Sequence, residues 1–238
     1  MASLIIYPLH VGTITRRLAN FCYGLEQGIA DFPLISWYIE GSDKRILIDT
    51  GGGDPTTVDE KLHPYRRDND HAIENALKKI GLTCEDIEIV IVTHLHWDHS
   101  AGNELFPNAK IIVQDKELEV ARNPFPVMAF FYIRGVVENV NYSIISGDTE
   151  IAKGVHLILT PGHTYGLQGV LVEAEKRRIF IASDTFPLFK NIEQEPPLIS
   201  NLYVDIKSYY DSIKKIISLS AFILPGHDFG VFEKEVYY

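Results

Sequence analysis

A short segment dense in histidine constrains this chain more than any other feature. Residues 94–99 read His-Leu-His-Trp-Asp-His, so three imidazoles and one carboxylate fall within six positions. Residues 88–92, directly before it, are rich in β-branched side chains and predict a buried strand. The polar segment therefore begins where a strand ends, on a loop held by a rigid scaffold, which is where sites tend to be built.

The residue types in this segment are suited to binding metal ions. Imidazole nitrogen and carboxylate oxygen are ligands that zinc and similar ions accept. Because side chains alternate faces along a strand, His94 and His96 can point the same way and bind one ion. Asp98 and His99 follow as the chain turns and can serve a second ion. The competing interpretation is a solvated polar loop, but imidazoles packed together without a metal would need other hydrogen-bond partners.

Three further candidate ligands follow other predicted strands. His163 lies in a Pro-Gly-His-Thr turn after the apolar run 155–159, and His227 lies in a Pro-Gly-His-Asp turn after residues 222–224. Both turns should bring their histidine out at a sheet edge. Asp184 follows another strand signal, and its two carboxylate oxygens could bridge two cations.

The order and spacing of these motifs resemble the metallo-β-lactamase superfamily, from about residue 34 to residue 228. A further matching motif is Ile-Leu-Ile-Asp-Thr-Gly, which contains Asp49. Within the superfamily the chain is most similar to the N-acyl-homoserine lactonase group, which has similar intervals between ligands. The resemblance implies the α/β class: an αββα sandwich of two mixed β-sheets with outer helices, in one metallo-hydrolase domain over residues 1–238.

The resemblance also implies how the ligands divide between two divalent metal ions. One ion would be held by His94, His96 and His163, the other by Asp98, His99 and His227, and both by a bridging Asp184. Asp49 would orient a ligand imidazole from behind. Zinc is the expected metal, and manganese and iron are alternatives because they accept the same nitrogen and oxygen ligands.

The chain departs from the lactonase group at one position. That group carries a tyrosine three residues after the bridging aspartate, where this chain has Pro187. Tyr23 or Tyr203 could supply a phenol to the substrate from elsewhere, and Phe186 could line the substrate site, with core packing as the alternative for each. A second apolar and aromatic stretch, residues 123–133, could wall a pocket or a dimer contact. This departure leaves the identity of the substrate open, but it does not affect the predicted metal site.

The activity implied is that of a dinuclear-metal hydrolase. The ions would lower the pKa of a bound water from about 15.7 towards 7, and the metal-bound hydroxide would open an ester-like carbonyl, with a lactone as first candidate. Asp98 or Asp184 would carry a proton to the leaving alkoxide. The alternative is a thioesterase or other acyl hydrolase on the same fold. A phosphodiesterase ranks lower, and a metal-binding module without turnover is the alternative from another class.

Composition narrows the class of partner. A chain of 238 residues, 46% hydrophobic, can form one domain with a substantial core. Its net charge of −10 argues against nucleic acid, and no apolar run approaches a membrane span. Two unrelated cysteines and no signal-peptide pattern favour a cytoplasmic protein. The expected partner is a small acyl substrate, with a homodimer left open, and the pair Arg16-Arg17 is expected on the solvated surface.

Periodicity and turn residues predict the order of elements. Strands are expected at residues 4–9, 34–40, 44–49, 110–113, 142–145, 155–159, 167–173, 178–183 and 222–224, and helices at 70–80, 115–121 and 204–219.

Overall fold

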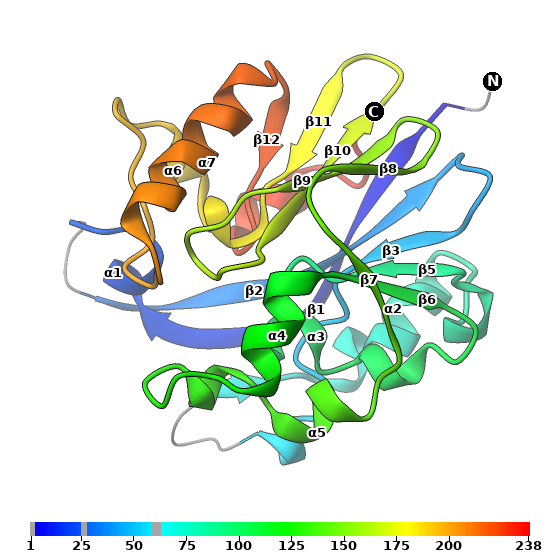
Figure 1. The fold of residues 1–238 in the computed structure, drawn as a ribbon. Coiled ribbons are helices and arrows are strands. Elements are labelled where there is room, and N and C mark those ends of the chain that lie inside the picture. Colours follow the sequence, from blue (N-terminus) through cyan, green and yellow to red (C-terminus); the bar gives the residue numbers. More distant parts are fainter. Residues whose placement is uncertain (1–2, 25–27, 59–62) are drawn as a thin grey trace.

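Two β-sheets pack face to face at the centre of the protein, and helices cover their outer faces (Figure 1). The structure, a computed structural model, describes residues 3–24, 28–58 and 63–238. The larger sheet has the strand order β4-β1-β2-β3-β5-β6-β7, and the smaller sheet has the order β12-β11-β10-β9-β8. Each sheet contains parallel and antiparallel pairs. The predicted αββα sandwich of two mixed sheets is confirmed.

The elements have the following bounds. The larger sheet contains β1 (Ile5–Arg17), β2 (Ile29–Glu40), β3 (Ile46–Ile48), β4 (Tyr65–Arg66), β5 (Ile89–Ile91), β6 (Lys110–Gln114) and β7 (Tyr142–Ile145). The smaller sheet contains β8 (Thr149–Ala152), β9 (Val155–Leu159), β10 (Gln168–Glu173), β11 (Arg178–Ile181) and β12 (Phe222–Leu224). The helices are α1 (Leu18–Phe21), α2 (Ile73–Lys79), α3 (Trp97–Ser100), α4 (Asp115–Arg122), α5 (Arg134–Glu138), α6 (Phe189–Ile192) and α7 (Ile206–Ser218).

The central strands of the larger sheet are buried on both faces. Ile48 and Ile91 share an apolar cluster with Ile181 of the smaller sheet, so this cluster fills the space between the sheets. Leu47 and Val90, which point the other way, belong to a cluster with side chains of α2 and α4. Burial on both faces explains why these strands read as continuous apolar runs. The rigid strands end at the loops that carry the histidines.

Helix α7 covers the outer face of the smaller sheet (Figure 1). Tyr209, Ile213 and Ile216 recur at helical spacing and pack with Phe180 of β11. The side chain of Asp205 caps the helix by accepting hydrogen bonds from two backbone N–H groups of its first turn. The helix predicted at residues 204–219 is thereby confirmed.

The first strand is much longer than predicted, because a β-bulge interrupts its alternation. His10 pairs with Ile35 but Thr13 pairs with Pro33, so β1 carries one extra residue in between. Gly12 has φ +141°, and a Cβ at this position would lie 2.5 Å from the Tyr65 ring. A bulge turns the following side chains to the opposite face.

The reversal can be followed in the apolar clusters. Leu9 before the bulge, Val11 within it and Ile14 after it all belong to the cluster under the helices. Arg16, two residues beyond Ile14, therefore lies on the same face as Ile14. The prediction that the strand ends at residue 9 was wrong.

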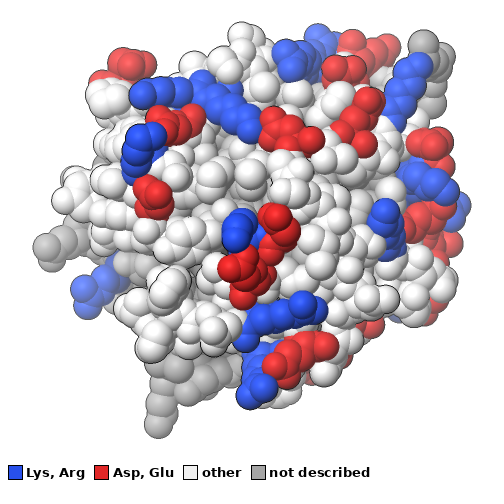
Figure 2. Space-filling view, viewed as in Figure 1, with Lys and Arg blue, Asp and Glu red and all other residues white. Residues whose placement is uncertain are grey.

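Charged side chains of both signs are interspersed on the face seen in Figure 2. Exposed ion pairs such as Lys207–Asp211, one turn apart on α7, contribute little to stability because water and salt screen them. The net charge of −10 therefore does not form a single acidic patch on this face. Among the described residues, no helix has the length and apolar character that crossing a membrane requires.

Candidate metal centre

The seven predicted ligands converge where strands of both sheets end. Their elements are the loop after β5 with helix α3, the turn after β9, the turn after β11 and the turn after β12. Three groups have ligand atoms within 4.8 Å of one another: His94, His96 and His163; His94, His99 and Asp184; and Asp98, His99 and His227. All seven residues are buried except Asp98, which is partly exposed.

The carboxylate of Asp184 lies between the two outer groups. Its Oδ2 is 3.2 Å from His163 Nε2, and its Oδ1 is 3.0 Å from His227 Nε2 and 3.3 Å from His99 Nε2. Burial alone would raise the pKa of Asp184, but the neighbouring imidazoles of His227, His163 and His99 hold it well below its usual range. Asp184 thus presents one anionic oxygen to each group.

Hydrogen bonds behind the imidazoles determine which ring nitrogen is free to bind a metal. His163 Nδ1 and His227 Nδ1 each donate to a backbone carbonyl, at 2.8 and 3.0 Å, and His99 Nδ1 donates to Asp49 at 2.8 Å. Carbonyl and carboxylate oxygens only accept, so each Nδ1 carries a hydrogen, and in the neutral ring each Nε2 then carries a lone pair. His99 Nε2 and His227 Nε2 lie 3.2 Å apart. Two lone pairs at this distance would repel each other unless a proton or a metal ion lies between them.

A second chain of hydrogen bonds orients His94. Asp49 accepts from the backbone N–H of Thr93 at 2.7 Å and from its hydroxyl at 2.8 Å. Because the Thr93 hydroxyl hydrogen is used in this way, its oxygen accepts from His94 Nδ1 at 3.2 Å. His94 Nε2 is left buried with no hydrogen-bond partner among the described residues. Asp49 therefore acts on two imidazoles, one directly and one through Thr93.

The charges of the cluster fit a bound cation. Burial lowers the pKa of His94 and His96 well below the usual value, and repulsion between neighbouring imidazoles adds to the effect. Burial also opposes protonation of His99, but Asp184, Asp49 and Asp98 outweigh it and raise its pKa well above the usual value. The carboxylates thus favour positive charge at His99, which a metal ion can supply in place of a proton. Imidazole nitrogen and carboxylate oxygen are the donors that zinc and similar ions accept. The residues present fit two divalent metal ions.

A narrow cavity opens beside the centre. It is lined by His96, Asp98, His163 and Asp184 together with Ile14, Arg16, Asn20, Phe21, Trp97, Phe131 and Leu202. The expectation that Arg16 lies on the solvated surface was wrong, because the bulge in β1 turns it to the face of Ile14. Burial lowers the pKa of its guanidinium, and the nearby Asp98 opposes this shift.

Part of the aromatic stretch 123–133 forms a wall of this cavity. The ring of Phe131 stacks on His96 with 4.6 Å between centroids and 23° between planes. The carbonyl of the preceding Phe130 accepts a hydrogen bond from His63 Nε2 at 2.9 Å. Phe125 and Val127 are exposed and do not line the cavity. The stretch thus fixes the ring of one proposed metal ligand.

The aromatic candidates for substrate contact lie elsewhere. Phe186 is fully buried in the cluster beneath α7 and does not line the cavity, a position that favours the alternative of core packing. Tyr23 and Tyr203 are exposed by 60% and 40%, and neither lines the cavity. The carbonyl of Pro187 accepts from the backbone N–H of His227 at 2.8 Å, so this position supports a ligand turn.

Glu117 is a supporting residue that the sequence analysis missed. Its fully buried carboxylate accepts from Leu95 N at 2.9 Å, Thr164 Oγ1 at 2.6 Å and Gly166 N at 3.1 Å. These contacts join the loop of His94 and His96 to the turn of His163. Burial raises its pKa although the hydrogen bonds oppose the shift. A glutamate within a predicted helix carries no signal of such a role.

A buried phenol was missed as well. Tyr209 Oη lies 2.8 Å from the carbonyl of Asp184 and 3.0 Å from that of Thr185, so α7 supports the bridging residue from behind. Burial raises the pKa of this phenol. In the sequence, Tyr209 is one of several apolar positions of an amphipathic helix.

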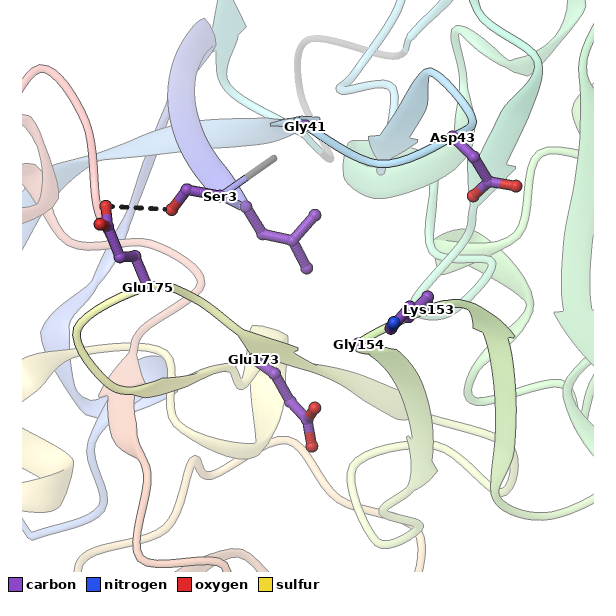
Figure 3. A pocket seen from close by; sticks show the side chains of 8 residues that line it. Ser3, Gly41, Asp43, Lys153, Gly154, Glu173 and Glu175 are labelled. Carbon is purple, nitrogen blue, oxygen red and sulfur yellow. Dashed lines mark hydrogen bonds between the residues drawn. The ribbon is translucent and has the colours of Figure 1, made fainter. Parts of the chain in front are cut away.

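A larger cavity lies apart from the candidate metal centre. It is lined by Ser3, Leu4, Gly41, Asp43, Lys153, Gly154, Glu173 and Glu175 (Figure 3). Its side chains come from the start of β1, the β2–β3 and β8–β9 turns and the end of β10, and Ser3 donates to Glu175. None of the seven clustered ligands lines it.

Known proteins resemble the chain in sequence and in structure. Residues 35–227 match the family described as the metallo-beta-lactamase superfamily. An N-acyl homoserine lactonase from Bacillus sp is 32% identical over 215 residues, which cover 84% of this chain and 83% of that protein. This protein belongs to the metallo-beta-lactamase superfamily.

Solved structures show the same similarity over nearly the whole chain. The crystal structure of a Bacillus thuringiensis AiiA mutant with N-decanoyl-L-homoserine bound at its active site has a TM-score of 0.84 and 28% identity, and the match covers 98% of this chain and 96% of that one. An N-acyl homoserine lactone hydrolase with the product N-hexanoyl-L-homoserine at its catalytic metal centre has a TM-score of 0.84 and 27% identity, with the same coverage.

Proposed function

We propose that this protein is a single-domain, dinuclear-metal hydrolase that opens the ring ester of lactones, with N-acyl homoserine lactones as the substrate class. The observation that carries the proposal is the convergence of two histidine-rich groups on the carboxylate of Asp184, beside a cavity. The relatives support the substrate class, because they are named as lactonases and two of the similar structures hold acyl-homoserines.

The proposed ligand assignment follows from the tautomers and distances. His94, His96 and His163 would hold one ion, Asp98, His99 and His227 would hold the other, and Asp184 would contact both. We propose zinc as the metal, although manganese and iron accept the same donors. Two such ions, when bound, supply Lewis acidity and a water of lowered pKa.

Other residues of the chain would orient the ligands, exclude water and transfer a proton in the proposed reaction. Asp49 and the backbone carbonyls behind His163 and His227 keep the imidazoles oriented with Nε2 towards the centre. Trp97 and Phe131 make the cavity wall apolar and exclude water beside the reacting carbonyl. Asp98 is the one partly exposed ligand and lines the cavity, so its carboxylate can carry a proton to the leaving alkoxide.

The test is hydrolysis of a substrate panel by zinc-loaded protein. The panel contains N-hexanoyl homoserine lactone, a thioester and a phosphodiester. We expect proton release from the lactone, which a chelator abolishes and added zinc restores. Faster turnover of the thioester or phosphodiester would replace the proposed substrate class, and no turnover by metal-replete protein would favour a metal-binding module.

A pair of variants tests the ligand assignment. His96→Ala should lower both zinc content, measured by mass spectrometry, and lactone turnover. His156→Ala is the matched control, because His156 on β9 lies outside the cavity and the clustered groups. Unchanged zinc stoichiometry in His96→Ala would contradict the assignment.

A further inference from the structure

The cavity beside the candidate metal centre contains a single lysine or arginine side chain among its described lining residues, that of Arg16. Its neighbours Ile14, Phe21, Trp97 and Phe131 are apolar, and the other lining residues are four proposed metal ligands, Asn20 and Leu202. A guanidinium is strongly hydrated when exposed, so placing it among apolar rings needs a compensating interaction. The opposite charge that acts on it is that of Asp98, which belongs to the proposed metal centre.

Two hydrogen bonds hold the side chain of Arg16. Nη1 donates to the Thr15 carbonyl at 3.1 Å, and Nη2 lies 3.1 Å from His63 Nδ1. Since a guanidinium cannot accept, His63 Nδ1 accepts here, and His63 Nε2 donates to the Phe130 carbonyl. These bonds use two of the five N–H donors of Arg16, and the other three have no acceptor within the described part of the chain.

The β-bulge makes this placement specific to Arg16. The extra residue at Val11–Gly12 reverses the faces of β1, so Ile14 and Arg16 point to the cavity while Arg17 points away and is exposed. Two adjacent arginines therefore occupy opposite environments. One of them faces the reacting centre with free donors.

Building on the proposed function, we propose that Arg16 determines substrate specificity by binding a carbonyl or carboxylate oxygen that the substrate carries in addition to its scissile ester. In an acylated homoserine lactone this oxygen belongs to the amide. The planar guanidinium offers paired N–H groups to such an oxygen, and the apolar neighbours strengthen the bond by excluding water. A substrate without this oxygen covers these half-buried donors without pairing them, which is how a site rejects such an analogue.

The test compares two substrates in three variants of the zinc-loaded protein. The substrates are N-hexanoyl homoserine lactone and an aliphatic γ-lactone of similar length without an amide. For Arg16→Gln we expect kcat/KM on the amide-bearing lactone to fall by roughly 10- to 100-fold, the range for a hydrogen bond to a charged group. On the aliphatic lactone it should stay within about threefold. Arg16→Lys, which keeps the charge but not the fork, should be intermediate, and the control Arg17→Gln should match the parent protein on both substrates.

Two outcomes would overturn the proposal. An equal fall on both lactones would show that Arg16 acts only by supporting His63 and the Phe130 segment. No fall on either would show that it does not touch the substrate. Zinc content and melting temperature, measured for every variant, identify any loss that comes from misfolding.

A binding measurement separates this proposal from the proposed function. Calorimetry with N-hexanoyl-homoserine, the ring-opened product, requires no turnover, and Arg16→Gln should weaken its binding while Arg17→Gln should not. If the parent protein hydrolysed neither lactone, the proposed function would fall, and product binding would still decide the role of Arg16. Equal binding by the parent and Arg16→Gln proteins would reject that role.

Discussion

The carboxylate of Asp49 sets the tautomers of two proposed metal ligands, and Asp49→Asn tests this role with almost no change in shape. The amide oxygen can still accept from the Thr93 N–H, but the amide NH₂ then faces His99 Nδ1 and the Thr93 hydroxyl. His99 must accept at Nδ1, which moves its hydrogen to Nε2. The Thr93 hydroxyl is then free to donate to His94 Nδ1, with the same result there. In both imidazoles the nitrogen that faces the centre becomes protonated.

The expected magnitude follows from the bonds that change. Loss of an outer hydrogen-bond partner typically weakens metal binding by about 10- to 100-fold, which is about 1.4–2.8 kcal/mol at 1.4 kcal/mol per tenfold. Loss of a hydrogen bond to a charged group should lower the free energy of unfolding of the metal-free protein by about 1.5–3 kcal/mol. Backbone strain adds little, because asparagine tolerates the left-handed φ of 56° at Asp49.

The assay is titration of metal-free protein with zinc against a chelating indicator, with imidazole nitrogen NMR to identify the tautomers. Thr93→Val is the informative comparison, since it removes the partner of His94 but leaves the bond between His99 and Asp49. It should weaken the ion of the His94 group alone, whereas Asp49→Asn should weaken both. The reasoning would be refuted if Asp49→Asn bound both ions within threefold of the parent affinity, or kept the hydrogen on His99 Nδ1.

Three further results are expected. Gly12→Ala should lower the free energy of unfolding, measured in urea, by about 1–3 kcal/mol, because its Cβ would lie 2.5 Å from the Tyr65 ring at φ +141°. Gly28→Ala is the control, because no atom of the described residues beyond its chain neighbours lies within 4 Å of its Cβ, and it should change this free energy by less than about 0.5 kcal/mol. Similar losses in the two variants would contradict the role of the bulge. Phe131→Ala removes the ring that stacks on the imidazole of His96, an interaction worth about 0.5–1.5 kcal/mol. Calorimetry should therefore show that zinc affinity falls by roughly 2- to 12-fold. Unchanged affinity would show that the stack does not support zinc binding. Burial lowers the pKa of His10 to about 4, with repulsion from a neighbouring imidazole adding to the effect. The unfolded chain takes up a proton at His10 near pH 6.5, whereas the folded chain does so only near pH 4. The parent protein should therefore lose about 1–2 kcal/mol of stability as pH falls through this window, after allowance for partial exposure, and His10→Gln should not show this loss. Equal acid sensitivity of the two proteins would reject this assignment.

Several elements could be predicted because their signals are local. The strands at residues 142–145, 155–159 and 222–224 coincide with β7, β9 and β12. Two ligand turns are Pro-Gly-His sequences that follow strands, and a third strand is followed by the histidine-rich segment. Residue type and position after a strand are enough to identify them. The helix at residues 115–121 was also predicted, but not that Glu117 within it is fully buried and binds two ligand loops. A glutamate on a solvated helix face and a glutamate in a buried hydrogen-bond network look alike in the local sequence, so only the tertiary packing distinguishes them.

The kinds of side chain that meet at the centre, and the strand ends that carry them, follow from residue identity and short-range spacing. The face to which Arg16 points depends on one extra residue in β1, which is held by the approach of Tyr65 from a segment about fifty positions away. The tautomers of His163 and His227 depend likewise on carbonyls of Leu202 and Pro33, far along the chain. Contacts between distant segments form only when the sheets pack, so they cannot be predicted from the periodicity of the sequence.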